Sequence, residues 1–217
     1  MKKLIPALAI FAITVSSCNN DAATKKETPV DSGLVATLDS PVKSSAVLDT
    51  AAIAKAWNDF KVPSTKHQLI RSWDGTWTGE VSQWMDPGSR PMVSRATMVS
   101  KTAANGLFQE SKWTGSMFGA PFEGKSLLGF DNGKKKFVST WIDNSSSGIV
   151  FMTGDWDENS KTLSLSGNQT DPVTGKDTEI RQVLKIVDSN TQILTMYGAG
   201  MDGKEMKFME GTFSRRK

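Results

Sequence analysis

The residues best placed to do chemistry are Trp141 and Asp143, which lie two positions apart and precede Asn144 and a serine-rich turn. Alternate residues of a β-strand project from the same face, so Trp141 and Asp143 share a face if this segment is a strand. If that face points into a barrel, an indole ring and a carboxylate lie together near its mouth and can orient a ligand with one polar end. The simpler interpretation is that Trp141 packs in the core while Asp143 and Asn144 shape the turn.

Two further residues, Trp113 and Arg181, are candidate ligand contacts. Tryptophan and methionine side chains make adaptable apolar walls, although ordinary core packing uses them equally well. An inward-pointing Arg181 would pair with a carboxylate of the wall or of a ligand, whereas a charge on a strand usually faces solvent. We therefore expect a ligand site formed by Trp113, Trp141, Asp143, Asn144 and Arg181.

Catalysis by paired carboxylates needs two inward acids at a defined separation. Asp143 with Glu110 or Glu210 is the available combination, but no motif supports it, and no catalytic residue is predicted. The chain has one cysteine and one histidine, His67, which leaves little material for a metal site or a nucleophilic triad. No metal and no cofactor are predicted.

The N-terminus has the layout of an export signal, with Lys2 and Lys3 followed by an apolar stretch from Leu4 to Val15. That stretch is shorter than the roughly 20 apolar residues of a membrane-spanning helix. The junction Val15-Ser16-Ser17-Cys18 resembles the lipobox of bacterial lipoproteins, in which the cysteine is diacylated and becomes the new N-terminus. The resemblance implies a signal peptide over 1–17, a lipidated Cys18 and a protein held at the cell envelope.

The resemblance to lipoproteins also implies that the membrane is a partner of this protein, through the lipid anchor on Cys18. Asn19, rather than aspartate, follows the cysteine and by the sorting rule of enteric bacteria favours the outer membrane; the leaflet and the oligomeric state are not predicted. Without residues 1–17 the chain carries 24 basic and 23 acidic side chains, so it lacks the basic surface expected of a nucleic-acid-binding protein.

Residues 18–48 are rich in Ala, Thr, Ser, Pro, Asp and Lys without a sustained period, which predicts a disordered tether. Residues 49–73 predict two short helices. Asp49 is a candidate N-cap for the first helix, in which the apolar residues follow helical spacing. Ser64 is a candidate N-cap for the second helix, which ends near Ser72.

From residue 74 to 217 short segments alternate with turn residues. Ten strands are predicted, at about 75–85, 91–101, 106–117, 121–130, 135–143, 148–157, 161–168, 177–187, 191–198 and 204–214. Connections this short force antiparallel pairing of successive strands. Ten strands are too many for a comfortable open sheet, so an up-and-down antiparallel barrel is expected. Charges on both faces of the strands argue against an outer surface that faces lipid.

The first strand opens with Gly75-Thr76-Trp77, which resembles the opening motif of calycins, the group that includes lipocalins and fatty-acid-binding proteins. That resemblance implies that Trp77 plugs the barrel base and that a basic residue near the last strand, Arg215 or Arg216, packs over it. The fold class expected is thus all-β, a calycin-like barrel of about ten strands preceded by two short helices.

A longer resemblance rests on several motifs that occur in order. They are Trp84-Met85-Asp86-Pro87-Gly88, Pro121-Phe122-Glu123-Gly124, Gly129-Phe130-Asp131-Asn132, the stretch Lys136 to Asn144, Asp171 to Lys176 and Gly203-Lys204-Glu205. Together they resemble the bacterial domain-of-unknown-function family 1579 over about residues 50–217. The resemblance implies a fold and no activity.

Three functions are compatible with these observations. The first is non-catalytic binding of a small hydrophobic or amphipathic molecule inside the barrel of a lipid-anchored envelope protein. The second is an envelope interaction module that uses the barrel as a scaffold. The third is a hydrolase or isomerase built on inward carboxylates.

Overall fold

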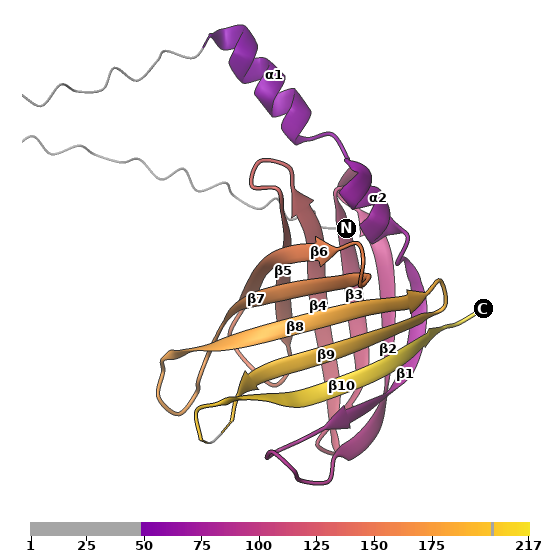
Figure 1. The fold of residues 1–217 in the computed structure, drawn as a ribbon, viewed down its shortest axis with the longest axis vertical. Coiled ribbons are helices and arrows are strands. Elements are labelled where there is room, and N and C mark those ends of the chain that lie inside the picture. The colour runs from indigo at the N-terminus through magenta and orange to yellow at the C-terminus, as the bar shows by residue number, and fades with distance from the viewer. Residues whose placement is uncertain (1–48, 201) are drawn as a thin grey trace, which may run out of the picture. The chain divides into compact units, whose positions relative to one another are not determined.

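The computed structural model describes residues 49–200 and 202–217, and most of these residues lie in β-strands (Figure 1). Two short helices come first, α1 (Thr50–Phe60) and α2 (Thr65–Arg71). Ten strands follow: β1 (Gly75–Gln83), β2 (Met92–Ala103), β3 (Phe108–Met117), β4 (Ala120–Asp131), β5 (Lys136–Asp143), β6 (Val150–Asp157), β7 (Thr162–Thr170), β8 (Asp177–Asp188), β9 (Thr191–Ala199) and β10 (Glu205–Arg215).

The strands form a closed antiparallel barrel in which each pairs with its neighbours in sequence and β1 closes the ring on β10. The predicted ten-stranded up-and-down barrel is therefore confirmed. The strand bounds differ from the predicted ones by a few residues. For example, β3 begins at Phe108 rather than at 106, because Asn105 and Gly106 have φ of 58° and 88° and form a left-handed turn after β2.

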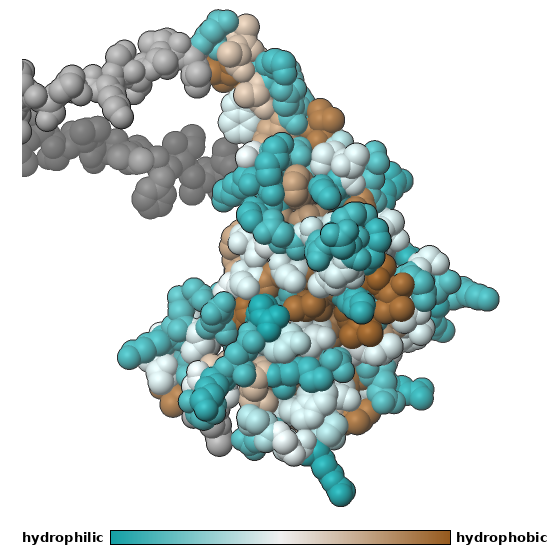
Figure 2. Space-filling view, viewed as in Figure 1, coloured by the Kyte–Doolittle hydropathy of each residue, from teal (hydrophilic) through white to brown (hydrophobic). Residues whose placement is uncertain are grey.

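The two helices differ in how they meet the barrel. Helix α1 begins after Asp49, whose carboxylate accepts a hydrogen bond from Ala51 N at 3.3 Å, and it buries none of its residues. Its Trp57 side chain is 67% exposed, and Figure 2 shows apolar residues on the surface of this helix. Asn132, in the turn between β4 and β5, donates to the carbonyls of Phe60 and Val62 at the end of α1.

Helix α2 covers one end of the barrel. Its Ile70 and the following Trp73 are buried in a cluster with side chains from β4 to β8, which are Leu128, Phe137, Met152, Leu163, Leu165 and Ile180. The helix starts at Ser64, whose backbone N–H donates to His67 Nδ1 at 2.9 Å. Burial of apolar surface between α2 and the strands therefore closes this end of the lumen.

The base of the barrel is held by Trp77 and Arg215, which are direct register partners on β1 and β10. Trp77 is almost fully buried, and the Arg215 guanidinium lies over its ring at 4.2 Å. The guanidinium also donates to the backbone carbonyls of Ser72, Asp74 and Ser189. This is the base packing that the resemblance to calycins implied.

Strand tilt connects this base to the opposite end of the barrel. One row of register partners crosses β1 to β5 and consists of Trp77, Met98, Trp113, Gly124 and Asp143. The tilt of barrel strands makes such a row climb along the barrel axis. Trp113 thus lies on the inner wall between the base and the mouth.

The described residues belong to one compact unit whose strands have no unpaired edge, and we expect this part to fold on its own. Within the described residues, neither helix is long and apolar enough to cross a membrane. The predicted signal peptide (1–17), the lipidated Cys18 and the tether (18–48) lie outside the described residues.

Candidate functional site

The lumen of the barrel holds a cavity of about 1430 Å³, lined by residues of all ten strands. Ligand pockets in proteins commonly measure about 300–1,000 Å³, so this lumen has room for a ligand larger than a typical small molecule. Most of the lining side chains are apolar or uncharged and polar. The cavity, rather than any surface feature, is the strongest candidate for a functional site.

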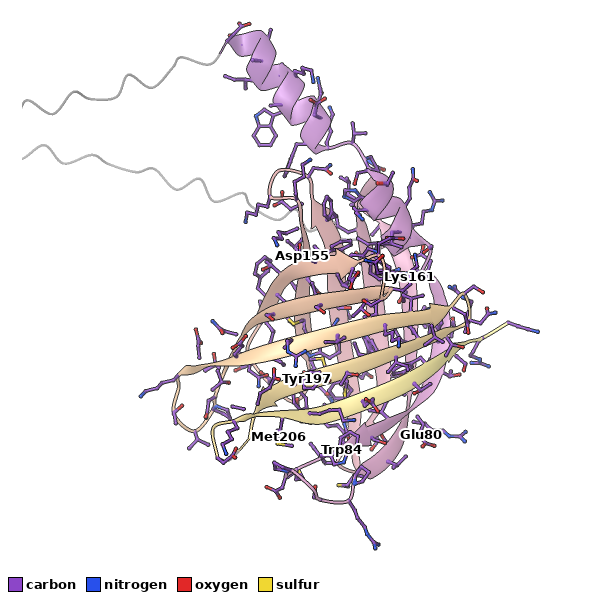
Figure 3. All side chains as sticks on the ribbon, viewed as in Figure 1. Glu80, Trp84, Asp155, Lys161, Tyr197 and Met206 are labelled. Atoms are coloured by element: carbon purple, nitrogen blue, oxygen red, sulfur yellow. The ribbon has the colours of Figure 1, made fainter. Side chains whose placement is uncertain are left out.

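The cavity reaches the end of the barrel away from α2. Residues of the loops at that end line it, namely Trp84, Met85, Ser145 to Ile149, Asp171, Pro172 and Gly200. Figure 3 places Trp84 and Met206 toward this end, whereas Lys161 lies beside α2. We call this end the mouth. The helical end is filled by the cluster under Trp73 and Ile70.

Trp141 and Asp143 meet at the mouth, on the same face of β5. The Trp141 indole N–H donates to Asp143 Oδ2 at 2.6 Å. The Trp141 ring stacks on Phe122 of β4, with centroids 6.1 Å apart and an interplanar angle of 19°. The ring passes over Gly124, where a Cβ atom would lie 2.4 Å from it. The absence of a side chain at 124 therefore fixes where the indole lies.

The Asp143 carboxylate is held by the turn that follows it. Its Oδ1 atom accepts hydrogen bonds from Ser145 N at 2.8 Å and Ser145 Oγ at 2.6 Å. Burial raises the pKa of Asp143, but the hydrogen bonds from Ser145 and Trp141 outweigh it, so the pKa lies below its ordinary value. Asp143 is a stable anion at neutral pH and poorly suited to act as a general acid.

Trp113 extends the aromatic wall inward from Trp141. Its ring meets Trp141 edge to face at 6.1 Å and Phe213 at 5.3 Å. The indole Nε1 atom of Trp113 is buried and has no hydrogen-bond partner among the described residues. A buried unpaired donor costs about 1–3 kcal/mol. Trp113 therefore adds apolar contact area to the lumen together with one unused donor.

Asn144 does not line the cavity, although it was expected at the ligand. Its side chain accepts from Glu123 N at 3.0 Å and donates to the Pro121 carbonyl at 3.1 Å. These bonds tie the end of β5 to the start of β4. The expectation for Asn144 is corrected: the residue shapes the turn behind Asp143.

Arg181 also departs from its expected place. It lies between the lumen-lining Ile180 and Gln182, so it points to the outer face of β8. There it donates to both carboxylate oxygens of Glu205, at 2.9 and 2.8 Å, and lies over the Tyr197 ring at 3.9 Å. The hydrogen bonds that Arg181 donates to Glu205 raise the pKa of Arg181 further. Arg181 is therefore outside the lumen and makes no contact with a molecule there.

Sequence reasoning missed the uncharged polar groups of the lumen. Gln83, Gln109, Gln182, Gln192, Ser100, Ser111, Ser126 and Ser139 all line the cavity. Some are satisfied by the protein: Ser100 and Ser111 share a hydrogen bond of 2.7 Å, and Gln109 donates to the Ile70 carbonyl at 3.0 Å. The alternation of residues along a strand could have found them. Gln192 lies two positions before the inward-facing Leu194 on β9 and therefore shares its face.

His67 lies on α2 and does not line the lumen. It is 3% exposed and meets Phe130 edge to face at 5.9 Å. Burial lowers the pKa of His67, partly offset by its hydrogen bond with the Phe130 backbone, so the neutral ring accepts from Ser64. His67 therefore caps the start of α2.

Catalysis by paired carboxylates and metal binding find little support among the residues that line the cavity. Glu110 and Glu210 do not line the lumen, and Glu210 pairs with Lys207 at 3.1 Å. No group of three or more His, Cys, Asp or Glu side chains in residues 49–200 and 202–217 is arranged to hold a metal ion.

One solved structure shares the fold at low sequence identity. The crystal structure of Rv2717c from M. tuberculosis superposes with a TM-score of 0.56 at 13% identity, covering 72% of this chain and 100% of that one. A redesigned β-barrel gives a TM-score of 0.36 at 14% identity, covering 68% of this chain and 95% of the other. No curated protein matches the sequence.

The family comparison is more informative than the structural one. The model of the family described as "Protein of unknown function (DUF1579)" matches residues 62–215. This range includes every strand and the motifs that pointed to the family from the sequence, so that resemblance is confirmed. The chain belongs to the DUF1579 family.

Proposed function

We propose that this protein binds a small hydrophobic or amphipathic molecule in the lumen of its barrel without transforming it. The observation that carries the proposal is the cavity of about 1430 Å³, which opens at one end and whose walls combine apolar and uncharged polar side chains. The apolar part of this wall is exposed to water unless a ligand covers it, and the burial of apolar surface favours binding.

The walls suit a molecule with an apolar body. Met98, Met152 and Met196 line the lumen beside the aromatic wall of Trp113 and Trp141. Methionine side chains are flexible and adapt to ligands of irregular shape, and tryptophan rings supply large apolar contact areas. At the mouth, the Trp141–Asp143 pair lines the cavity and places a carboxylate beside an aromatic surface, which supports a ligand with one polar end.

The barrel base supports a calycin-like assignment. Trp77 beneath Arg215 reproduces the base packing that the Gly75-Thr76-Trp77 resemblance implies. Calycins as a class carry small ligands in such barrels, so this likeness agrees with the cavity. The order of strands, an up-and-down meander closed by β1 on β10, agrees as well.

We propose further that the protein works at a membrane, held by acyl chains on Cys18. The support is the sequence alone: the basic n-region, the short apolar stretch and the Val15-Ser16-Ser17-Cys18 junction. An envelope lipid or a scavenged compound is then within reach of the lumen. Labelling with an alkyne fatty acid in a bacterial host tests the anchor, and a Cys18→Ala variant is expected to lose the label.

Ligand binding is tested on protein produced from Asn19 onward, which omits the expected signal and lipid anchor. The purified protein is passed through native mass spectrometry, and its organic extract is analysed for lipids. We expect a bound molecule in substoichiometric or stoichiometric amount. A structure at high resolution in which the lumen is packed with side chains or holds only water would overturn the proposal.

A further inference from the structure

The charged residues that line the cavity are all acidic. They are Asp143, Asp171 and Asp177, and no Lys, Arg or His among the described residues lines it. All three lie at the mouth, at the end of β5 and on both sides of the loop between β7 and β8. A ligand that enters the lumen therefore meets carboxylates and no cation of the cavity wall.

The basic residues of the mouth loops do not offset this arrangement. Arg90, Lys176 and Lys204 lie on these loops but do not line the cavity. Lys204 lies 3.9 Å from the carboxylate of Asp202. Lys207 lies 3.1 Å from Glu210 and over the Trp84 ring at 4.7 Å. An anionic headgroup at the mouth would thus face carboxylates at close range, while the cations lie outside the wall.

Asp143 is the acid that is most firmly placed. Ser145 holds one of its oxygens and the Trp141 indole holds the other, so the carboxylate stays at the lumen wall. Beside it lie the stacked rings of Trp141 and Phe122 and the edge-on ring of Trp113. An anion next to aromatic faces is the environment that recognises alkylammonium groups, because the ring faces and the carboxylate both carry negative potential.

Deeper in the lumen the polar groups are uncharged. Gln192 and Ser139 are 2% and 5% exposed and line the cavity. Such amide and hydroxyl groups can pair with uncharged polar groups of a ligand but cannot neutralise a charge. Burying an unpaired ionic group is strongly unfavourable, so the charged end of a ligand must stay at the mouth.

We propose that the lumen selects its ligand by charge and takes an amphiphile with an ammonium headgroup. Asp143 and the Trp141–Phe122 pair hold the ammonium group at the mouth, and the apolar chain enters the lumen. Fatty acids and other molecules with a carboxylate or phosphate headgroup are rejected. This inference rests on the proposed function, that the lumen holds an amphiphile.

The test compares three probes with the same ten-carbon chain: decyltrimethylammonium, decan-1-ol and decanoate. Each is titrated below its micelle concentration into protein produced from Asn19 onward, and binding is followed by calorimetry and by the fluorescence of the cavity tryptophans. We expect decyltrimethylammonium to bind about tenfold or more tighter than decan-1-ol, with decanoate weakest. Added salt should reduce the difference in affinity between the charged probes and decan-1-ol, because part of that difference is electrostatic.

Variants locate the selectivity. Asp143→Asn should lower the affinity for decyltrimethylammonium toward that for decan-1-ol and leave the alcohol unchanged. Asp155→Asn is the matched control, because Asp155 lies on β6, pairs with Lys136 at 2.5 Å and does not line the cavity. It should leave all three affinities unchanged. Asp177→Asn serves as a second lumen variant if Asp143→Asn melts at a markedly lower temperature, and it should also weaken binding of the cation.

The outcomes separate the inference from the proposed function. Binding of decan-1-ol and decanoate as tight as that of decyltrimethylammonium would overturn charge selection while leaving lumen binding intact. Equal losses of affinity for decyltrimethylammonium in Asp155→Asn and Asp143→Asn would likewise overturn charge selection and leave lumen binding intact. Failure of all three probes to bind a folded protein would overturn both.

Discussion

The Trp141 indole N–H donates to the Asp143 carboxylate at 2.6 Å, between residues two apart on one strand. The bond fixes the indole plane against the mouth of the lumen, and the same carboxylate is held from the other side by Ser145. An aromatic surface and an anion are thereby kept at a constant relative position. Preorganisation of this kind lowers the cost of ordering side chains when a ligand binds.

The position of Trp141 depends on Gly124, which lies beneath its ring. In a Gly124→Ala variant the new Cβ atom would lie 2.4 Å from ring carbons of Trp141, so the indole must move or the strands must part. We expect a loss of about 1–3 kcal/mol in the free energy of unfolding, measured by chemical denaturation. We also expect weaker ligand binding, because the Trp141–Asp143 bond is disturbed.

Gly148→Ala is the matched control for this change. A Cβ atom there would lie 3.4 Å from Ser146 Oγ, which is ordinary contact. Its effect should stay within about 0.5 kcal/mol. Equal losses in the two variants would show that a methyl group at 124 is harmful for some reason other than the indole.

Arg215 is predicted to stabilise the barrel base. An Arg215→Met variant keeps an apolar stem over Trp77 but removes the guanidinium that lies over the ring and donates to Ser72 and Ser189. The expected loss is about 2 kcal/mol, from the cation–π contact and the unpaired carbonyls. Thermal and denaturant unfolding measure it. The adjacent Arg216 is exposed, and Arg216→Met should be nearly neutral; a comparable loss there would contradict the assigned role.

His67 gives the protein a predictable dependence on pH. Its folded pKa lies below the ordinary value because burial disfavours the charged ring. Between the folded and unfolded pKa the unfolded chain binds more protons, so stability from His67 is present above pH about 6.5 and is lost as the pH falls through the folded pKa. The slope from one group does not exceed about 1.4 kcal/mol per pH unit.

Urea unfolding at a series of pH values from neutral to mildly acidic measures this slope. A His67→Gln variant should be less stable at neutral pH and should show a flatter profile over the same range. The carboxylates with lowered pKa, such as Asp143, act only at still lower pH and do not obscure the comparison. Parallel profiles for the two proteins would show that another group is responsible.

Local patterns predicted most of this fold, because turn residues and strand alternation are properties of short segments. The same alternation placed Trp141 and Asp143 on one face, and both line the cavity. Arg181 was misplaced because β8 carries apolar residues on both faces, so parity alone does not say which face is inward. The decisive interaction, with Glu205, spans 24 positions of the chain.

Asn144 illustrates the same limit at a turn. Its partners Glu123 and Pro121 lie 21 and 23 positions earlier, across the β4–β5 ladder. A residue next to a candidate ligand contact therefore turned out to support the strand ends. Local sequence patterns could not predict the size of the lumen either. That size depends on the closure of β1 on β10 and on the tilt of all the strands.

The uncharged lumen groups offer a test of whether the cavity is shaped for a ligand at the expense of stability. Gln192 is almost fully buried and lines the cavity, so a Gln192→Leu variant replaces an amide of the lumen wall with an apolar group. We expect its free energy of unfolding without ligand to be unchanged or to rise by up to about 2 kcal/mol, while its affinity for the natural ligand falls.

Gln109→Leu is the contrasting variant. The Gln109 amide donates to the Ile70 carbonyl at 3.0 Å and to Asp74 at 2.8 Å, and its loss leaves both acceptors without this donor. That variant should be destabilised by about 1–3 kcal/mol. A barrel that loses stability equally in both variants would mean that Gln192 serves the fold rather than a ligand.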